Sequence, residues 1–276
     1  MSKGPIFFYQ RFYFDIMLPD DITLQTILLL SCFAFCAGFI DAIVGGGGLI
    51  QLPALLIFLP QFTIPTIIGT HKLASVSGTL VAASQYMQKV KIDWKVILPA
   101  ILVTGVFALL GARLVTSLDK NTLKPIILVL LVLVFIYTLI KKDMGTHHQP
   151  KYVGNIFLLG VLATGAVLGF YDGFFGPGMG SFLIFAFVSI FSLDFLHASA
   201  YAKILNCASN VPAIIFFMSS GDVLFQVAIP LGIANILGSI IGTRLALFKG
   251  SAFVRVFFLI VVIGVIIRFG YDIIKL

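Results

Sequence analysis

Charged residues are scarce in this sequence, and their scarcity excludes a soluble domain. Only 11% of the 276 residues are charged, whereas 60% are hydrophobic, and the mean hydropathy is +1.12. A soluble domain needs more polar side chains to cover its surface. Apolar runs at residues 22–44, 96–115 and 125–140 are close to the ~17–25 residues that a helix needs to cross hydrocarbon. The composition therefore predicts an integral membrane protein.

The sequence also lacks segments in which apolar and polar side chains alternate. A membrane β-barrel would show such alternation over strands of ~10 residues, so we exclude a barrel and expect helices as the spanning elements. No convincing cleavable signal is present, since residues 1–21 mix Lys3 and Arg11 with three aspartates before a full-length span begins. We expect residues 1–21 to form an N-terminal arm.

Cysteine is rare, and its distribution offers neither a disulfide framework nor a metal site. Cys32, Cys36 and Cys207 all lie in apolar segments, with no CxxC pair and no histidine at metal-ligand spacing. We expect them to be small packing residues, and we expect no metal and no cofactor. The net charge of +7 does not indicate a nucleic-acid partner, because Lys and Arg gather in the cytoplasmic loops of membrane proteins whatever the substrate.

Glycine, in contrast, is abundant and is concentrated in two segments. Residues 38–48 and 169–178 each place an aspartate, Asp41 or Asp172, just before a glycine run in an apolar setting. Glycine inside a helix is costly in backbone entropy, so the preceding span should end there. The apolar piece at residues 49–59 is too short, at ~1.5 Å per residue, to cross a bilayer unaided. We therefore expect a half-helix or re-entrant arm after each break.

The two glycine-rich segments are related by an ungapped offset of 131 residues. The offset pairs Asp41 with Asp172 and Lys72 with Lys203, and it also pairs glycines, an arginine and a proline. The further matches are Gly38–Gly169, Phe39–Phe170, Gly45–Gly176, Gly47–Gly178, Pro99–Pro230, Gly111–Gly242, Arg113–Arg244 and Leu114–Leu245. One offset that recovers so many rare residues indicates an internal duplication. We predict membrane repeats at residues 22–142 and 152–276, joined by a linker at 143–151.

The charges in the loops indicate that the second repeat is inverted relative to the first. Residues 89–95 hold three lysines, whereas residues 219–222, on the mate of this loop, hold none. The other lysines on the side that we assign to the cytoplasm are Lys141, Lys142, Lys151 and Lys249. We predict an all-α polytopic membrane protein of two tandem inverted repeats. Each repeat should have about four full spans and a short broken or re-entrant helix.

Two lysines lie in otherwise apolar segments, and each begins a polar helix face. Positions i, i+3 and i+7 share a face of a helix. The faces consist of Lys72, Ser75 and Thr79 and of their repeat mates Lys203, Asn206 and Asn210. Together they could surround a small anion and replace its hydration shell. Alternatively, each lysine snorkels to the membrane interface. We favour binding, because a snorkelling anchor does not need polar residues one turn further in.

Asp41 and Asp172 are the second pair of candidates. A carboxylate in hydrocarbon costs roughly 2.5–3.5 kcal/mol on insertion scales, so it usually pairs, takes up a proton or faces a cavity. Each aspartate could couple transport to protons or pair with Lys72 or Lys203. Each could instead cap the half-helix that follows, whose first N–H groups need acceptors. These roles are not exclusive.

The glycine runs admit three interpretations. A phosphate-binding loop fails, because neither run is followed by Lys-Ser/Thr or lies between a strand and a helix. Close packing of membrane helices remains open, since small residues allow it. We favour the unwound centre of a discontinuous helix, whose backbone N–H groups would face an anion. The glycines concerned are Gly45, Gly46, Gly47, Gly176 and Gly178.

Four other basic side chains are not expected to bind substrate. Arg113 and Arg244 each end a span in a Gly-x-Arg sequence, which favours an interface anchor. His71 and His197 lie near the starts of helices and do not match by the offset. We expect these histidines to make ordinary local hydrogen bonds.

Three segments carry a resemblance to a known family. They are GFIDAIVGGGGLIQLPALL at residues 38–56, GFYDGFFGPGMGSF at 169–182 and AKILNCASN at 202–210. The chain resembles the TauE/SafE sulfite-exporter family, especially its YfcA-like branch, over nearly its whole length from residue 22. The resemblance implies a polytopic inner-membrane protein of two related halves. It also implies transport of sulfite, sulfonates or other small sulfur-containing or organic anions.

The leading hypothesis is a secondary transporter, and specifically an exporter, of a small anion. The two repeats would alternate access to a site at their interface near the middle of the bilayer. An anion channel is the first alternative. A membrane-embedded enzyme or accessory subunit is another, although the sequence shows no nucleophile–base pair and no catalytic domain. The expected partners are a small anionic substrate and the lipid bilayer of a bacterial-type inner membrane, and a homo-oligomer stays open.

Overall fold

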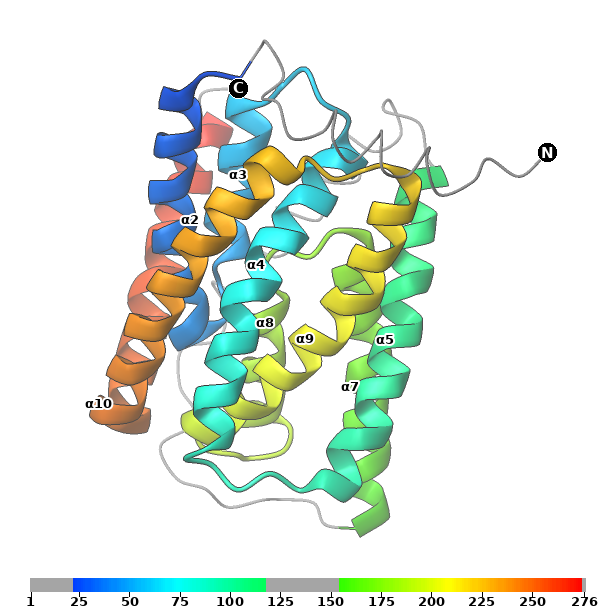
Figure 1. Ribbon diagram of the computed structural model, residues 1–276. Helices are drawn as coiled ribbons and strands as arrows, with labels where there is room; N and C mark the ends of the chain where they lie inside the picture. Colours follow the sequence, from blue (N-terminus) through cyan, green and yellow to red (C-terminus); the bar gives the residue numbers. More distant parts are fainter. Residues whose placement is uncertain (1–21, 118–153, 275–276) are drawn as a thin grey trace, which may run out of the picture.

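The computed structural model describes residues 22–117 and 154–274, with side chains as far as residue 250, and all regular structure in these ranges is helical (Figure 1). The helices before the gap are α2 (Leu24–Val44), α3 (Gly48–Phe58), α4 (Ile64–Met87) and α5 (Trp94–Ser117). Those after the gap are α7 (Gly154–Phe174), α8 (Met179–Ser189), α9 (Phe195–Ser220) and α10 (Phe225–Ile274). The expected all-α class is therefore confirmed for this part of the chain. The N-terminal arm, the apolar run at 125–140 and the linker at 143–151 lie outside it.

Five of the described helices are long and apolar enough to cross a membrane. They are α2, α5, α7, α9 and the part of α10 from Phe225 to Gly250. At Gly250 the backbone of α10 leaves helical geometry, with φ 78°. Helix α4 has 24 residues, but it is more polar than the other long helices, because it carries the side chains that face the interior. The apolar helices α3 and α8 have only 11 residues each, as expected of half-helices.

The helices pack in pairs that combine the two halves of the chain. Helix α10 packs along α2, and α7 packs along α5. Figure 1 shows these pairs at opposite sides of the molecule, with α4 and α9 between them. Helix α4 contacts α9 directly, while α3 packs on α4 and α8 packs on α9. The arrangement places the most polar helices at the centre.

Glycines allow the paired helices to approach until their backbones touch. A β-carbon added at Gly38 of α2 would overlap the carbonyl oxygen of Asn235 in α10. A β-carbon at Gly169 of α7 would lie 2.6 Å from the carbonyl oxygen of Thr104 in α5. Both contacts are related by the 131-residue offset. Small residues at helix crossings are typical of membrane proteins.

The outer faces of the long helices are apolar. Leu24, Leu102, Val167 and Ile233 are between 58% and 71% exposed, although each belongs to an otherwise well-packed helix. Such faces suit contact with lipid tails rather than with water. Two of the cysteines, Cys32 and Cys36, lie on this exposed surface, so the expectation that they fill the core was wrong. Cys207 is buried, as expected.

The first and second halves run in opposite directions in Figure 1. Helix α2 starts at the top of the view and α7 at the bottom, and α4 and α9 likewise begin at opposite ends. The N-cap residues of α4 and α9 are Thr63 and Asp194, which correspond by the 131-residue offset. The Thr63 hydroxyl accepts the N–H of Thr66 at 3.3 Å, and the Asp194 carboxylate accepts the N–H of Leu196 at 2.8 Å. The local hydrogen bond expected of His197 is confirmed, since its Nδ1 lies 2.6 Å from Asp194 Oδ2.

Candidate functional site

Both expected breaks are present at the glycine runs. Helix α2 ends at Val44, where Gly45 takes a left-handed conformation with φ 76°. Helix α7 ends at Phe174, and Gly176 and Gly178 follow with φ of 98° and 84°. These conformations are accessible to glycine but strained for other residues. The glycines therefore end the first helix of each half and turn the chain into α3 and α8.

The two breaks meet inside the protein. The N–H of Ser181 in α8 donates to the carbonyl oxygen of Gly45 at 3.1 Å, and the Ser181 hydroxyl donates to the carbonyl oxygen of Val44 at 2.8 Å. A β-carbon added at Gly180 would lie 2.6 Å from the Gly45 Cα, so no larger residue fits there. The first turn of α8 thus packs directly against the turn that ends α2. The two breaks are therefore in direct contact.

Lys72 of α4 forms a buried ion pair with Asp172 of α7. The distance from Lys72 Nζ to Asp172 Oδ2 is 2.8 Å, and the two side chains are 1% and 4% exposed. Lys72 also donates to Asn210 Oδ1 at 2.9 Å. The hydroxyl of Ser209 donates to the same carboxylate oxygen of Asp172 at 2.7 Å. Helix α9 therefore supplies hydrogen-bond partners to both members of the pair.

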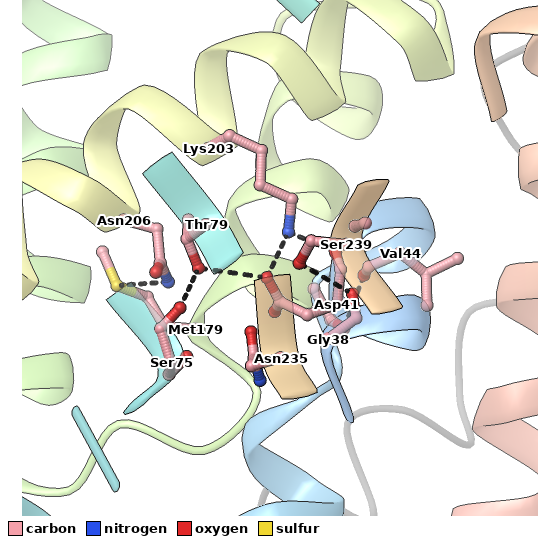
Figure 2. A network of polar contacts seen from close by, with 12 residues as sticks. Gly38, Asp41, Val44, Ser75, Thr79, Met179, Lys203, Asn206, Asn235 and Ser239 are labelled. Atoms are coloured by element: carbon pink, nitrogen blue, oxygen red, sulfur yellow. Dashed lines mark hydrogen bonds and ion pairs between the residues drawn. The ribbon is translucent and has the colours of Figure 1, made fainter. Parts of the chain in front are cut away.

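Lys203 of α9 forms the equivalent pair with Asp41 of α2 (Figure 2). The distance from Lys203 Nζ to Asp41 Oδ2 is 2.7 Å, and Lys203 also donates to the main-chain oxygen of Asp41. Thr79 of α4 donates to Asp41 Oδ2 at 3.4 Å. In each pair the lysine and the aspartate come from different halves of the chain. The two pairs consequently bind the halves together across the centre of the molecule.

These pairs bear on two of the alternatives that the sequence left open, namely snorkelling of the lysines and helix capping by the aspartates. Both lysines are almost completely buried, so neither reaches toward a membrane surface and the snorkelling alternative is wrong. Neither aspartate caps the half-helix that follows it, because the N-cap positions of α3 and α8 are Gly47 and Gly178, without a side-chain capping bond. The capping interpretation is therefore also wrong. The carboxylates serve instead as acceptors for the opposite lysines.

A small cavity lies where the breaks and the central helices meet. Its lining is polar and comes from both halves of the chain. Seven of the predicted binding residues line it, together with both aspartates: Lys72, Ser75, Asn206, Asn210, Gly45, Gly176, Gly178, Asp41 and Asp172. The other predicted residues, Thr79, Lys203, Gly46 and Gly47, are outside the lining. Thr79 and Lys203 nevertheless contact Asp41, because both side chains donate to its Oδ2.

The cavity is not symmetric, although the ion pairs are. Lys72 lines it, whereas Lys203 does not. Lys203 is held by both the side chain and the main chain of Asp41, at the last turn of α2. Lys72 has only side-chain partners, Asp172 and Asn210. Lys72 is therefore the ammonium group that a bound molecule could reach.

His71 is a cavity residue that the sequence analysis missed. It is 5% exposed, its Nδ1 has no hydrogen-bond partner among the described residues, and Nε2 lies 3.4 Å from where a β-carbon of Gly48 would be. The expected local hydrogen bond is therefore wrong for this histidine. The 131-residue offset pairs His71 with Ala202, so the comparison of the two halves did not point to this histidine. A buried polar atom without a partner normally indicates an unseen ligand or water.

The remaining lining residues were also missed. They are Gly48, Met179 and Gly180, from the first turns of the two half-helices. Gly48 and Met179 are repeat mates, so the offset from the predicted glycines could have found this pair. Ser209 was missed because its mate is Gly78, which has no side chain to pair with Asp41.

The lining combines charged and uncharged polar groups. It contains one ammonium group, the carboxylates of Asp41 and Asp172, the amides of Asn206 and Asn210, the hydroxyl of Ser75, and His71. The N-terminal ends of α3 and α8 also open onto it, and their partial positive charge favours an anion. Within the described ranges, no three His, Cys, Asp or Glu side chains are grouped closely enough to hold a metal ion.

Comparison with known proteins identifies the family of the chain. A family model described as sulfite exporter TauE/SafE matches residues 30–269. The chain belongs to this family. No solved structure matches it.

Three curated relatives of the chain are named as membrane transporters. Probable membrane transporter protein ORF9 of Sinorhizobium sp is 37% identical over 92% of this chain and 95% of its own length. A probable membrane transporter protein of Haemophilus influenzae is 31% identical over 91% and 97%. Probable membrane transporter protein YfcA of Escherichia coli K12 is 32% identical over 88% and 89%. These TauE/SafE relatives are named for transport rather than for an enzymatic activity.

Proposed function

We propose that this TauE/SafE protein is a secondary transporter of a small anion, such as sulfite, a sulfonate or another small sulfur-containing anion. The observation that carries the proposal is the polar cavity between the two glycine breaks. The cavity presents Lys72, unpartnered His71 and two half-helix N-termini. An oxyanion with several acceptor oxygens would satisfy all of these donors.

We further propose that the chain consists of two inverted repeats that alternate access to this cavity. Helices α2 and α7 both have 21 residues, α3 and α8 both have 11, and the members of each pair correspond by the 131-residue offset. The opposite directions of the two halves in Figure 1 support the inversion. Inverted repeats with broken helices at a midplane site are a common architecture of secondary transporters.

The alternation of access would involve a movement of one half against the other where the two broken helices meet. At the centre, the halves contact each other through the hydrogen bond from Ser181 to Gly45 and through the two ion pairs. Other hydrogen bonds also join the halves, such as Thr66 to Asp222 and Asn235 to Gln51, and rocking of one half against the other would change these as well. We place the protein in a bacterial inner membrane, with net export of the anion when it accumulates in the cytoplasm.

Transport by purified protein in liposomes tests the proposal. We expect it to move radiolabelled sulfite, thiosulfate or methanesulfonate faster than protein-free vesicles. Lys72→Met should abolish this flux, because it removes the cavity's ammonium group. Lys249→Met is the matched control, since Lys249 is exposed and distant from the lining. Flux through a channel would run only downhill, so uphill accumulation identifies a carrier. No flux of any of these anions would contradict the proposed function.

A further inference from the structure

The cavity is electrically neutral before any anion enters it. Lys72 and Lys203 each carry one positive charge, and Asp172 and Asp41 each carry one negative charge that offsets it. All four are almost completely buried. An anion that bound beside Lys72 would leave an additional negative charge in a medium of low dielectric constant. An uncompensated buried charge is strongly unfavourable, so a compensating charge must accompany the anion.

We propose that Asp172 takes up one proton for each singly charged anion that binds, so that the protein moves the anion and the proton together. The inference rests on the anion-transport function proposed above. Protonation converts the Asp172 carboxylate to a neutral carboxylic acid and ends its ion pair with Lys72. The ammonium group of Lys72 stays charged and coordinates the anion instead. The net charge of the site is the same before and after the step.

Geometry assigns the proton to Asp172 rather than to Asp41. Both members of the Lys72–Asp172 pair line the cavity, so an entering anion competes directly with Asp172 for Lys72. Lys203 does not line the cavity and is held additionally by the main-chain oxygen of Asp41. A proton on Asp41 would therefore free no ammonium group for the anion. Two negative groups that share one cation commonly share a proton as well.

The surroundings of Asp172 can accommodate both of its forms. Ser209 donates to Oδ2 in the charged form, and the same hydroxyl also donates to the main-chain oxygen of Asn206 at 2.8 Å. Ser209 thus keeps a partner when Asp172 is neutral. The other polar or titratable groups that face Asp172 or adjoin it are Lys72 and His71 from α4, Asn210 from α9 and neighbouring Tyr171, whose hydroxyl donates to Pro177 O. His71 is the alternative proton carrier that a test must separate from Asp172.

Such coupling is compatible with export. The loaded and the empty forms of the site carry the same charge, so the membrane potential does not drive either form. Only the pH difference opposes export of an anion with a proton. A difference of one pH unit is balanced by an anion ratio of about tenfold, and any larger excess inside the cell leaves it.

Proteoliposomes with the membrane potential clamped at zero test the assignment. Methanesulfonate is the main probe, because it is singly charged and carries no titratable proton near neutral pH. Thiosulfate is the doubly charged comparison, whose movement with one proton also carries net charge, and sulfite is compared with protein-free vesicles. We expect an acidic exterior to drive uptake of the transported anion above its external concentration, with acidification of the interior reported by a trapped pH dye. Equal uptake with and without the pH gradient would overturn the proposal.

Substitutions of the buried charged and histidine residues test which side chain takes up the proton. Asp172→Asn should still exchange labelled for unlabelled anion but should lose the response to the pH gradient, because the amide mimics the neutral acid and cannot release a proton. Asp172→Glu should retain the response. Lys203→Met/Asp41→Asn removes the other ion pair without changing the net charge of the site, and His71→Gln removes the alternative carrier. Both variants should respond to the gradient. A response that survives in Asp172→Asn, or is lost in Lys203→Met/Asp41→Asn or His71→Gln, overturns the assignment.

Two outcomes distinguish failure of the coupling from failure of the transport function. Anion flux without proton movement contradicts only the coupling. Absence of flux of all three anions in the wild-type protein contradicts the transport function and, with it, the coupling. If Asp172→Asn does not fold, Ser209→Ala provides a second measurement. Loss of this hydroxyl removes a donor that favours the charged carboxylate, so half-maximal uptake should shift to higher pH. An unchanged profile would overturn the role of Asp172.

Discussion

Lys72 and Asp172 are 100 positions apart in the chain, yet their charged atoms lie 2.8 Å apart in the buried centre of the protein. Lys203 and Asp41 repeat the relationship with the halves of the chain reversed. Each lysine therefore depends on the other half for its counter-charge. This reciprocity makes the centre of the protein the place where folding, stability and the proposed transport are linked.

Breaking one ion pair should be more harmful than removing it completely. We predict that Lys72→Met lowers the stability by about 3–5 kcal/mol, because Asp172 is left as an unpaired buried charge. The double variant Lys72→Met/Asp172→Asn should recover most of this loss, since neutral groups replace both charges. Neither variant should transport anions. Thermal unfolding in detergent, together with flux in liposomes, measures both effects.

The other pair provides the control for this experiment. Lys203→Met/Asp41→Asn should likewise be more stable than Lys203→Met alone. Because Lys203 does not line the cavity, this double variant should keep measurable anion binding. Equal stability of each single variant and its double variant would show that the buried charges do not depend on each other.

A substrate anion should replace a missing carboxylate. In Asp172→Asn, Lys72 has lost its counter-charge, so an anion that enters the cavity relieves an unfavourable buried charge. We predict that sulfite raises the melting temperature of this variant more than that of the wild-type protein, because ligand binding to the folded state stabilises it. Chloride at the same ionic strength is the control for general screening. A larger shift for the wild type would contradict an anion site beside Lys72.

Much of this site could be predicted from the sequence, because the matches at an offset of 131 residues are visible there. The offset paired Asp41 with Asp172 and Lys72 with Lys203, and the glycines after each aspartate located both breaks. Helical periodicity placed Ser75, Asn206 and Asn210 on the faces that now line the cavity. The patterns were informative because a polar residue in an apolar helix is rare and costly.

What the sequence could not supply was the partner of each charge. An aspartate before a glycine run can cap the next helix or pair with a distant lysine. Only the positions of Lys72 beside Asp172 and of Lys203 beside Asp41 decide between these roles. His71 was missed for a related reason: a histidine beside a lysine is unremarkable until a cavity is seen next to it. Asymmetric residues such as Ser209 are invisible to any comparison of repeats.

The contact between the two breaks should tolerate no side chain. We predict that Gly180→Ala severely lowers the yield of folded protein, because the new methyl group would lie 2.6 Å from the backbone of Gly45. Overpacking of this kind costs about 1–3 kcal/mol or more. Gly154→Ala is a matched control: Gly154 has φ 61° but nothing within 4 Å of an added β-carbon, so only backbone strain applies. Size-exclusion profiles in detergent compare the two.

The cap of α9 should make part of the stability depend on pH. Burial would raise the pKa of Asp194, but hydrogen bonds from the His197 side chain and from the N–H groups of His197 and Leu196 outweigh it and lower the pKa from 3.8 to about 2. A carboxyl with a lowered folded-state pKa stabilises fully above its unfolded value, and this stabilisation is lost as the pH falls from about 4 to about 2.

Asp194→Asn separates this effect from other acid-induced changes. Asparagine also caps helices well, but it does not titrate, so the variant should lose less stability over this pH range than the wild type. Melting temperatures in detergent at pH 6, 4 and 3 measure the difference. Parallel curves for the two proteins would show that the Asp194–His197 contact contributes nothing to acid sensitivity.

Two buried polar atoms without partners allow function to be separated from stability. His71 belongs to the cavity lining and its Nδ1 is buried, whereas Thr104 Oγ1 lies between α5 and α7 and Thr104 does not line the cavity. An unsatisfied buried polar group costs about 1–3 kcal/mol, and an apolar group of similar shape removes that cost. We predict that His71→Leu and Thr104→Val both raise the melting temperature of the protein without substrate.

Only the substitution in the cavity should affect transport. His71→Leu should raise the KM for the anion, because the substrate loses a donor, while Thr104→Val should leave KM and the maximal rate unchanged. Where a buried polar group serves ligand binding and does not stabilise the fold, its replacement is expected to raise stability and to lower function. If His71→Leu transports normally, the partner of Nδ1 is a bound water instead of the substrate. If it melts at a lower temperature, the imidazole has a structural role in the fold.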